Sequence, residues 1–69
     1  MEDEYEVLDT LTGFSIEPGD LIRTAEGLEI VVHEIDHVDD GYEIRYYDVW
    51  ADEYDNVIIG EDEFVELLG

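Results

Sequence analysis

The sequence predicts an all-β fold, a small five-stranded barrel, and three observations support this. Two apolar-rich runs, residues 28–38 and 42–50, flank the turn residues Asp39, Asp40 and Gly41, which is the pattern of a β-hairpin. The first run is rich in Ile and Val, as half-buried strands are. The 69 residues provide room for a single domain with a thin core.

The charge of the chain is extreme. It has 22 acidic and 2 basic residues, Arg23 and Arg45, for a formal net charge of −20, and it has no Lys. The 45% hydrophobic content is nevertheless that of a folding chain. Because about 1 M salt shortens the screening length to roughly 3 Å, we interpret the evenly spread acidity as adaptation to high salt. The bias resembles that of proteins from salt-accumulating halophilic archaea. The alternative is a functional anion, such as a DNA mimic or a partner for a basic protein.

Several classes of protein are excluded or disfavoured. Without Cys, neither a disulfide nor a thiolate metal site can form. No apolar run approaches the roughly 20 residues of a membrane span, and the acidic start differs from a basic secretory signal. We therefore expect a cytoplasmic protein without membrane association.

The chain divides into an irregular N-terminal arm, residues 1–17, and a barrel, residues 18–69. In the arm, Thr10, Thr12 and Gly13 argue against a long helix, and we expect this segment to cover one end of the barrel. Pro18 and Gly19 then predict a turn, followed by a short strand at 20–24 and a second turn at 25–27.

The long strand at 28–38 does not alternate cleanly. Ile30 and Val32 share one face while Val31 and Ile35 lie on the other, which predicts a bend or β-bulge. A polar loop at 51–55 and a short strand at 56–59 follow the hairpin. The last segment fits either a short helix or a tight turn at 61–63 followed by a final strand, and we favour the strand because eight residues make a marginal helix.

This order of elements resembles an SH3-like small barrel. The segment from Gly60 to Leu68 resembles the SH3 ending, in which a 3₁₀ turn precedes an aromatic-Val-x-Leu strand. Gly19-Asp20-Leu21-Ile22, with Gly27 and Val31 downstream, is similar to the start of a KOW-type module. The chain departs from RNA-binding KOW modules because Glu26 and Glu29 stand where those carry basic residues, and the acidic-aromatic opening motif of peptide-binding SH3 domains is not recognisable. The resemblance therefore implies a fold rather than a function.

The sequence predicts no metal site and no cofactor. His33 and His37 are four residues apart, which on a strand is about 13 Å, too far for one ion unless Glu34 or Asp36 folds in. The Asp-rich turn fails as a calcium loop, since Val38 and Tyr47 occupy ligand positions.

Catalytic motifs are not recognisable either. Ser15 is the only Ser, and the sequence has no nucleophile elbow, phosphate-binding Gly loop or Cys nucleophile. Because so small a chain also has little room for a concave site, we expect a protein that is not an enzyme.

The aromatic residues of the second half carry the functional prediction. We expect Tyr46 to join Ile44, Val31 and Phe64 in the core. A kink near Asp48 would place Trp50 beside outward-facing neighbours, and exposed aromatics near an Arg are favoured at interaction surfaces. The predicted binding residues are Arg45, Tyr47, Trp50 and Tyr54. We expect a binding or adaptor module that contacts a protein partner or a second copy. The alternative is nucleic-acid association or DNA mimicry, although two Arg are few for direct phosphate contact.

Overall fold

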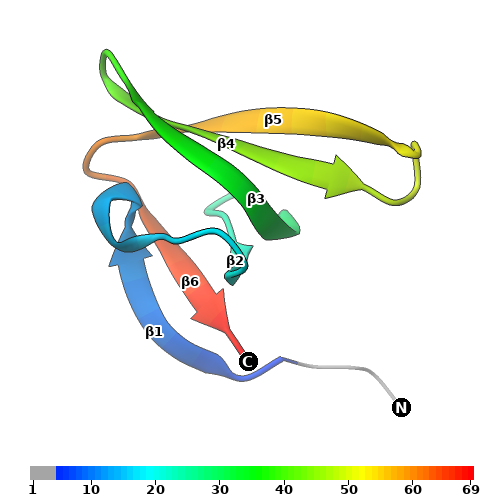
Figure 1. Ribbon diagram of the computed structural model, residues 1–69. Coiled ribbons are helices and arrows are strands. Elements are labelled where there is room, and N and C mark those ends of the chain that lie inside the picture. The colour runs from blue at the N-terminus through cyan, green and yellow to red at the C-terminus, as the bar shows by residue number, and fades with distance from the viewer. Residues whose placement is uncertain (1–4) are drawn as a thin grey trace.

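The structure is a computed structural model that describes residues 5–69, within which lie six β-strands and one 3₁₀ helix (Figure 1). In chain order the elements are β1 (Val7–Thr12), η1 (Gly13–Ser15), β2 (Leu21–Arg23), β3 (Glu29–Val38), β4 (Gly41–Asp48), β5 (Glu53–Gly60) and β6 (Phe64–Leu68). The prediction of an all-β fold is confirmed. Among the described residues there is no helix with the length and apolar character needed to cross a membrane.

All six strands belong to one open antiparallel sheet with the order β1-β6-β2-β3-β4-β5. The predicted closed barrel of five strands is wrong, because β1 and β5 are the two edges and do not pair with each other in this order. The prediction of an irregular N-terminal arm is also wrong over Val7–Thr12, which forms strand β1. This stretch pairs with β6, so the backbone groups on one side of it are hydrogen-bonded to the last described strand.

Strand β3 belongs to both halves of the sheet. Its beginning, Glu29 to Val31, pairs with β2, whereas its remainder, from Val32 to Val38, pairs with β4. The register shifts between Val32 and Glu34, which confirms the predicted bend. Figure 1 shows the result: β3, β4 and β5 lie across the top, and β1 and β6 lie below them.

The turns follow the predicted residue chemistry. Gly19 and Gly27 adopt φ angles of 97° and 93°, a region that glycine enters without steric cost. The Asp39-Asp40 turn joins β3 to β4, as predicted. The final segment is a turn followed by β6, so the strand alternative is confirmed. The predicted strand at 56–59 is longer than expected, since β5 already begins at Glu53.

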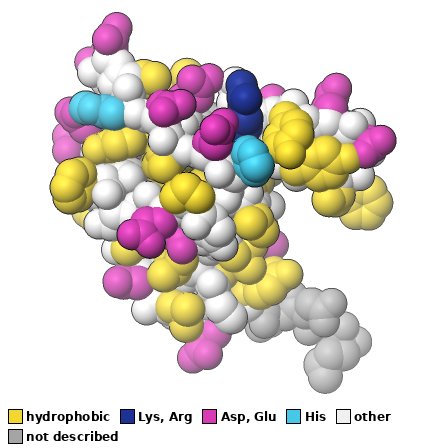
Figure 2. Space-filling view, viewed as in Figure 1, with side chains coloured by type: hydrophobic (Ala, Val, Ile, Leu, Met, Phe, Trp, Pro, Cys, Tyr) yellow, Lys and Arg dark blue, Asp and Glu magenta, His cyan; other side chains and the backbone are white. Residues whose placement is uncertain are grey.

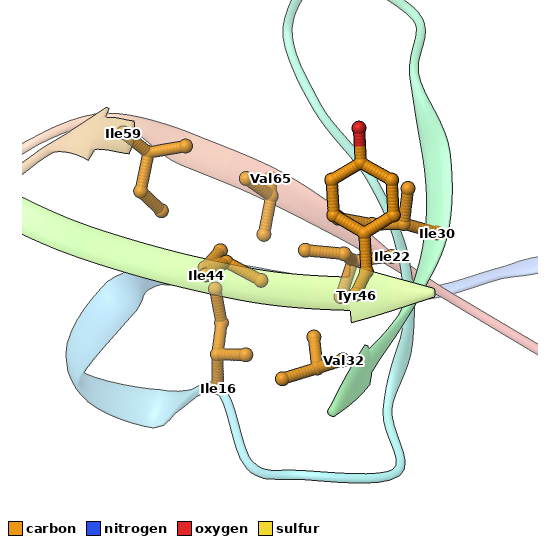
Figure 3. Close-up of a cluster of buried hydrophobic side chains, with 8 residues drawn as sticks. All are labelled: Ile16, Ile22, Ile30, Val32, Ile44, Tyr46, Ile59 and Val65. Atoms are coloured by element: carbon orange, nitrogen blue, oxygen red, sulfur yellow. The ribbon is translucent and has the colours of Figure 1, made fainter. Parts of the chain in front are cut away.

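The hydrophobic core lies between the two halves of the folded-over sheet (Figure 3). Its buried members come from β2 to β6 and from the segment after η1: Ile16, Ile22, Ile30, Val32, Ile44, Tyr46, Ile59 and Val65. Burial of Ile44 and Tyr46 is as predicted. The assignment of Val31 and Phe64 to the core is wrong, because they are 57% and 60% exposed on the opposite faces of their strands.

A pair of isoleucine variants tests this assignment of faces. Ile44 is fully buried, so Ile44→Ala is expected to lower the free energy of unfolding by about 2–5 kcal/mol through lost burial and a cavity. Ile58 lies on the neighbouring strand but is 64% exposed, and Ile58→Ala is expected to change it by only about 0.5 kcal/mol. Urea unfolding followed by circular dichroism measures both; equal losses would contradict the faces described.

Candidate functional site

A groove opens where β3 turns away from β4. Tyr46 is the last residue of β4 that pairs with β3, and Tyr47 and Asp48 continue alongside β5 alone. The beginning of β3 meanwhile follows β2. The wedge between them, which we call the β3–β4 groove, has a volume of about 570 Å³. Its lining comes from the segments 28–33 and 46–50, together with Leu21.

An aromatic cluster forms one wall of this groove and continues onto the outer face of β4 and β5. Tyr47 and Tyr54 are cross-strand partners whose rings meet edge to face, with centroids 5.2 Å apart. The ring of His33 lies 5.1 Å from that of Tyr54. We call His33, Tyr47 and Tyr54 the aromatic cluster. Edge-to-face rings at such distances attract one another, so the cluster holds a defined shape.

Trp50 lies at the turn between β4 and β5. Oδ1 of Asp48 accepts hydrogen bonds from the backbone N–H groups of Trp50 (2.9 Å) and Ala51 (3.2 Å), an Asx-type turn that fixes the local backbone. The indole is 95% exposed although it lines the groove, and Val49 beside it is 71% exposed. Figure 2 shows hydrophobic side chains gathered at this projecting end of the molecule, with a hollow beneath.

The four predicted binding residues are thus only partly brought together. Tyr47 and Trp50 line the groove. Tyr54 contacts Tyr47 from the neighbouring strand β5 and does not line the groove. Arg45 lies on the outer face, where its Nη1 is 3.7 Å from Oε1 of Glu34, and it does not line the groove. Sequence reasoning missed His33 as part of the site. The signal was the alternation of β3: with Ile30 and Val32 on the core face, His33 lies on the outer face.

Carboxylates surround the site, and few cations balance them. Within residues 5–69, Arg23 holds β2, β3 and β6 together by ion pairs to Glu66 (2.7 Å) and Glu29 (3.0 Å). The hydrogen bonds to Glu66 and Glu29 raise the pKa of the Arg23 guanidinium. The guanidinium of Arg23 is therefore already paired with carboxylates of the sheet. The groove itself carries Glu29 and Asp48.

The two histidines lie in separate places. His37 stacks on Tyr42, with ring centroids 4.8 Å apart, and its Nε2 lies 3.1 Å from Oε2 of Glu61. His33 belongs to the aromatic cluster instead. In the described part of the chain no three His, Asp or Glu side chains come together in a way that holds a metal ion.

Comparisons with known proteins give no relative for this chain: no protein-family model, no curated protein and no solved structure matches it.

The contact between Tyr47 and Asp52 makes the site sensitive to alkali. The Tyr47 hydroxyl donates to Oδ1 of Asp52, and this hydrogen bond, with burial and nearby negative charge, raises the pKa of Tyr47 above its ordinary value of 10.0. Asp52 has a φ of 57°, which glycine tolerates, so Asp52→Gly removes the acceptor without new backbone strain. We expect the pKa of Tyr47 to fall in this variant, measured by NMR titration of labelled tyrosine rings.

The sign of the linked stability follows from the raised pKa. The contribution of the contact is present below the pKa of tyrosine in the unfolded chain and is lost as pH rises through the higher pKa of the folded protein. Asp52→Asn keeps an acceptor and serves as the control. An unchanged Tyr47 titration in Asp52→Gly would contradict the role of the hydrogen bond.

Proposed function

We propose that this protein is a non-enzymatic binding module that contacts a protein partner through the β3–β4 groove and the aromatic cluster beside it. One observation carries the proposal: Tyr47 and Trp50 are exposed residues that line a concave surface, with exposed Tyr54 beside them, on a chain of net charge −20. A highly charged chain can cover its surface with carboxylates, so clustered exposed aromatics need another reason. Aromatic residues in pockets are the usual anchors of protein–protein contacts.

For the fold, we propose a partly open relative of the SH3-like barrel. The meander β3-β4-β5 and a last strand that follows a turn and pairs with β1 support this. The turn at Gly19 before β2 and the second turn at Gly27 are in keeping with a KOW-like start. This likeness concerns the arrangement of strands and does not imply an activity.

For the setting, we propose a cytoplasm with high salt. Ion pairs in residues 5–69 use only Glu29, Glu34, Glu61 and Glu66, a small part of the 22 acidic residues. The remaining carboxylates repel one another at low ionic strength. Direct nucleic-acid binding is the weaker alternative, since Arg23 is held in the sheet and Arg45 stands beside a carboxylate.

Substitution of the aromatic residues tests the binding function. With Tyr47→Ala and Trp50→Ala combined, capture of protein partners from an extract of the source cells in molar KCl is expected to fall at least about tenfold, because hot-spot aromatics carry most of the binding energy. Cross-linked complexes quantified by mass spectrometry provide the measurement.

Phe14 and Phe64 make a matched control for this experiment. They are also exposed, at 86% and 60%, but do not line the groove. Phe14→Ala with Phe64→Ala is expected to leave capture unchanged. Equal capture by the aromatic double variant and the wild-type protein would refute the proposed surface.

Salt titration tests the proposed setting. Thermal unfolding in rising KCl is expected to show a midpoint that increases steadily from millimolar to molar salt, because screening relieves repulsion between carboxylates. Replacing several exposed acidic residues of β5, such as Glu53 and Asp55, by Gln and Asn is expected to flatten this dependence. A midpoint independent of salt would contradict adaptation to high salt.

A further inference from the structure

The β3–β4 groove combines an apolar lining with carboxylates at its rim. Ile30 and Val32 on β3 and Tyr46 on β4 are buried residues that form its floor, while Leu28 and Val49 are exposed at its margins. Its volume of about 570 Å³ lies within the range of about 300–1,000 Å³ typical of small-ligand pockets, which is room for one long side chain and its neighbours. The occupant therefore needs substantial apolar surface.

The polar groups of the groove favour a cation. Tyr47 and Trp50 are among the residues that line it, and aromatic rings attract guanidinium and ammonium groups. Asp48 uses Oδ1 to accept the hydrogen bonds of the turn, and no described residue donates a hydrogen bond to its Oδ2. The second carboxylate, Glu29, already has Arg23 at 3.0 Å. Asp48 is thus the carboxylate best placed to pair with an incoming positive charge.

We propose that the groove binds an arginine-bearing segment of a basic partner protein, with the side-chain stem on the apolar floor and the guanidinium between Tyr47, Trp50 and Asp48. This inference rests on the proposed function and names the chemistry of its partner. Charge complementarity supports this occupant, because the chain carries −20 and the groove contains carboxylates but no basic residue other than His33. A second copy of this acidic chain would bring like charge into the same place.

Arginine also suits the ionic conditions proposed above. Long-range attraction between charges is screened within about 3 Å at 1 M salt. Stacking of a planar guanidinium on aromatic rings and burial of its aliphatic stem depend on contact and persist under these conditions. Affinity in the groove is therefore expected to retain a large part that molar salt does not remove.

Trp50 is the only Trp of the chain and reports on the groove directly. A capped peptide with one Arg between two Leu is titrated into the 69-residue protein in molar KCl, and Trp50 emission is recorded. The matched peptide carries citrulline, which has the shape of arginine without its charge. We expect a blue shift of the emission and binding of the Arg peptide about tenfold tighter than that of the citrulline peptide.

Variants test where the peptide binds, and NMR distinguishes a loss of binding from a loss of folding. Tyr47→Leu and Asp48→Asn are each expected to reduce the preference for the Arg peptide, whereas Tyr47→Phe, which keeps the ring, retains it. Asn at position 48 keeps an oxygen that can accept the hydrogen bonds of the turn. NMR spectra of each variant show whether the fold persists, and a variant that has lost its fold is replaced by Trp50→Leu, whose peptide binding is measured by titration calorimetry.

Each outcome distinguishes the inference from the proposed function. Equal affinity for the two peptides, or no binding of either, overturns the arginine site. If capture of partners still depends on Tyr47 and Trp50, the binding module stands without the arginine site. If capture is the same with and without these two residues, both proposals fall. A Trp50 emission that shifts with protein concentration alone assigns the groove to a second copy and overturns the basic partner.

Discussion

The structure depends on the bend of β3. One strand pairs with β2 at its beginning and with β4 over the rest, so it holds the two halves of the sheet together. The backbone of Val32 extends the β2 side, because its N–H donates to Asp20 (2.9 Å) and its carbonyl accepts from Gly19 (2.7 Å). The same change of direction folds the sheet over its core and opens the groove. A straight β3 would leave neither an enclosed core nor a concave surface.

Charge sets the second constraint on this molecule. A chain with 22 acidic residues and two Arg cannot neutralise its carboxylates by ion pairs. Arg23, one of the two, pairs with a carboxylate on β3 and another on β6, so a single guanidinium links three neighbouring strands. Exposed apolar residues occur on several strands, and four of them, Tyr47, Val49, Trp50 and Tyr54, lie at one end of the β4–β5 hairpin. Carboxylates elsewhere keep the protein hydrated, and this end remains available for contact.

Local signals were predictable from the sequence and long-range pairing was not. The hairpin, its bend and the glycine turns depend on neighbouring residues, and all were found as predicted. The pairing of β1 with β6 joins the two ends of the chain, and no local pattern in Val7–Thr12 indicates a partner so distant. Val31 was wrongly assigned to the core, although the alternation of its own strand places it on the face opposite to Ile30. Trp50 and Tyr47 are exposed as predicted, and the alternation of β3 that turns His33 outward also places it beside Tyr54.

The edges of the open sheet explain why the groove is the better place for a partner. An unpaired edge strand invites strand addition, and both edges here carry features that oppose it. On β1 the register shifts between Val7 and Asp9, which interrupts regular pairing. On β5 the exposed residues include Glu53 and Asp55, whose charges a second acidic strand would meet directly. The groove has an apolar floor with two carboxylates, Glu29 and Asp48, so a basic partner gains contact area there without bringing like charges together.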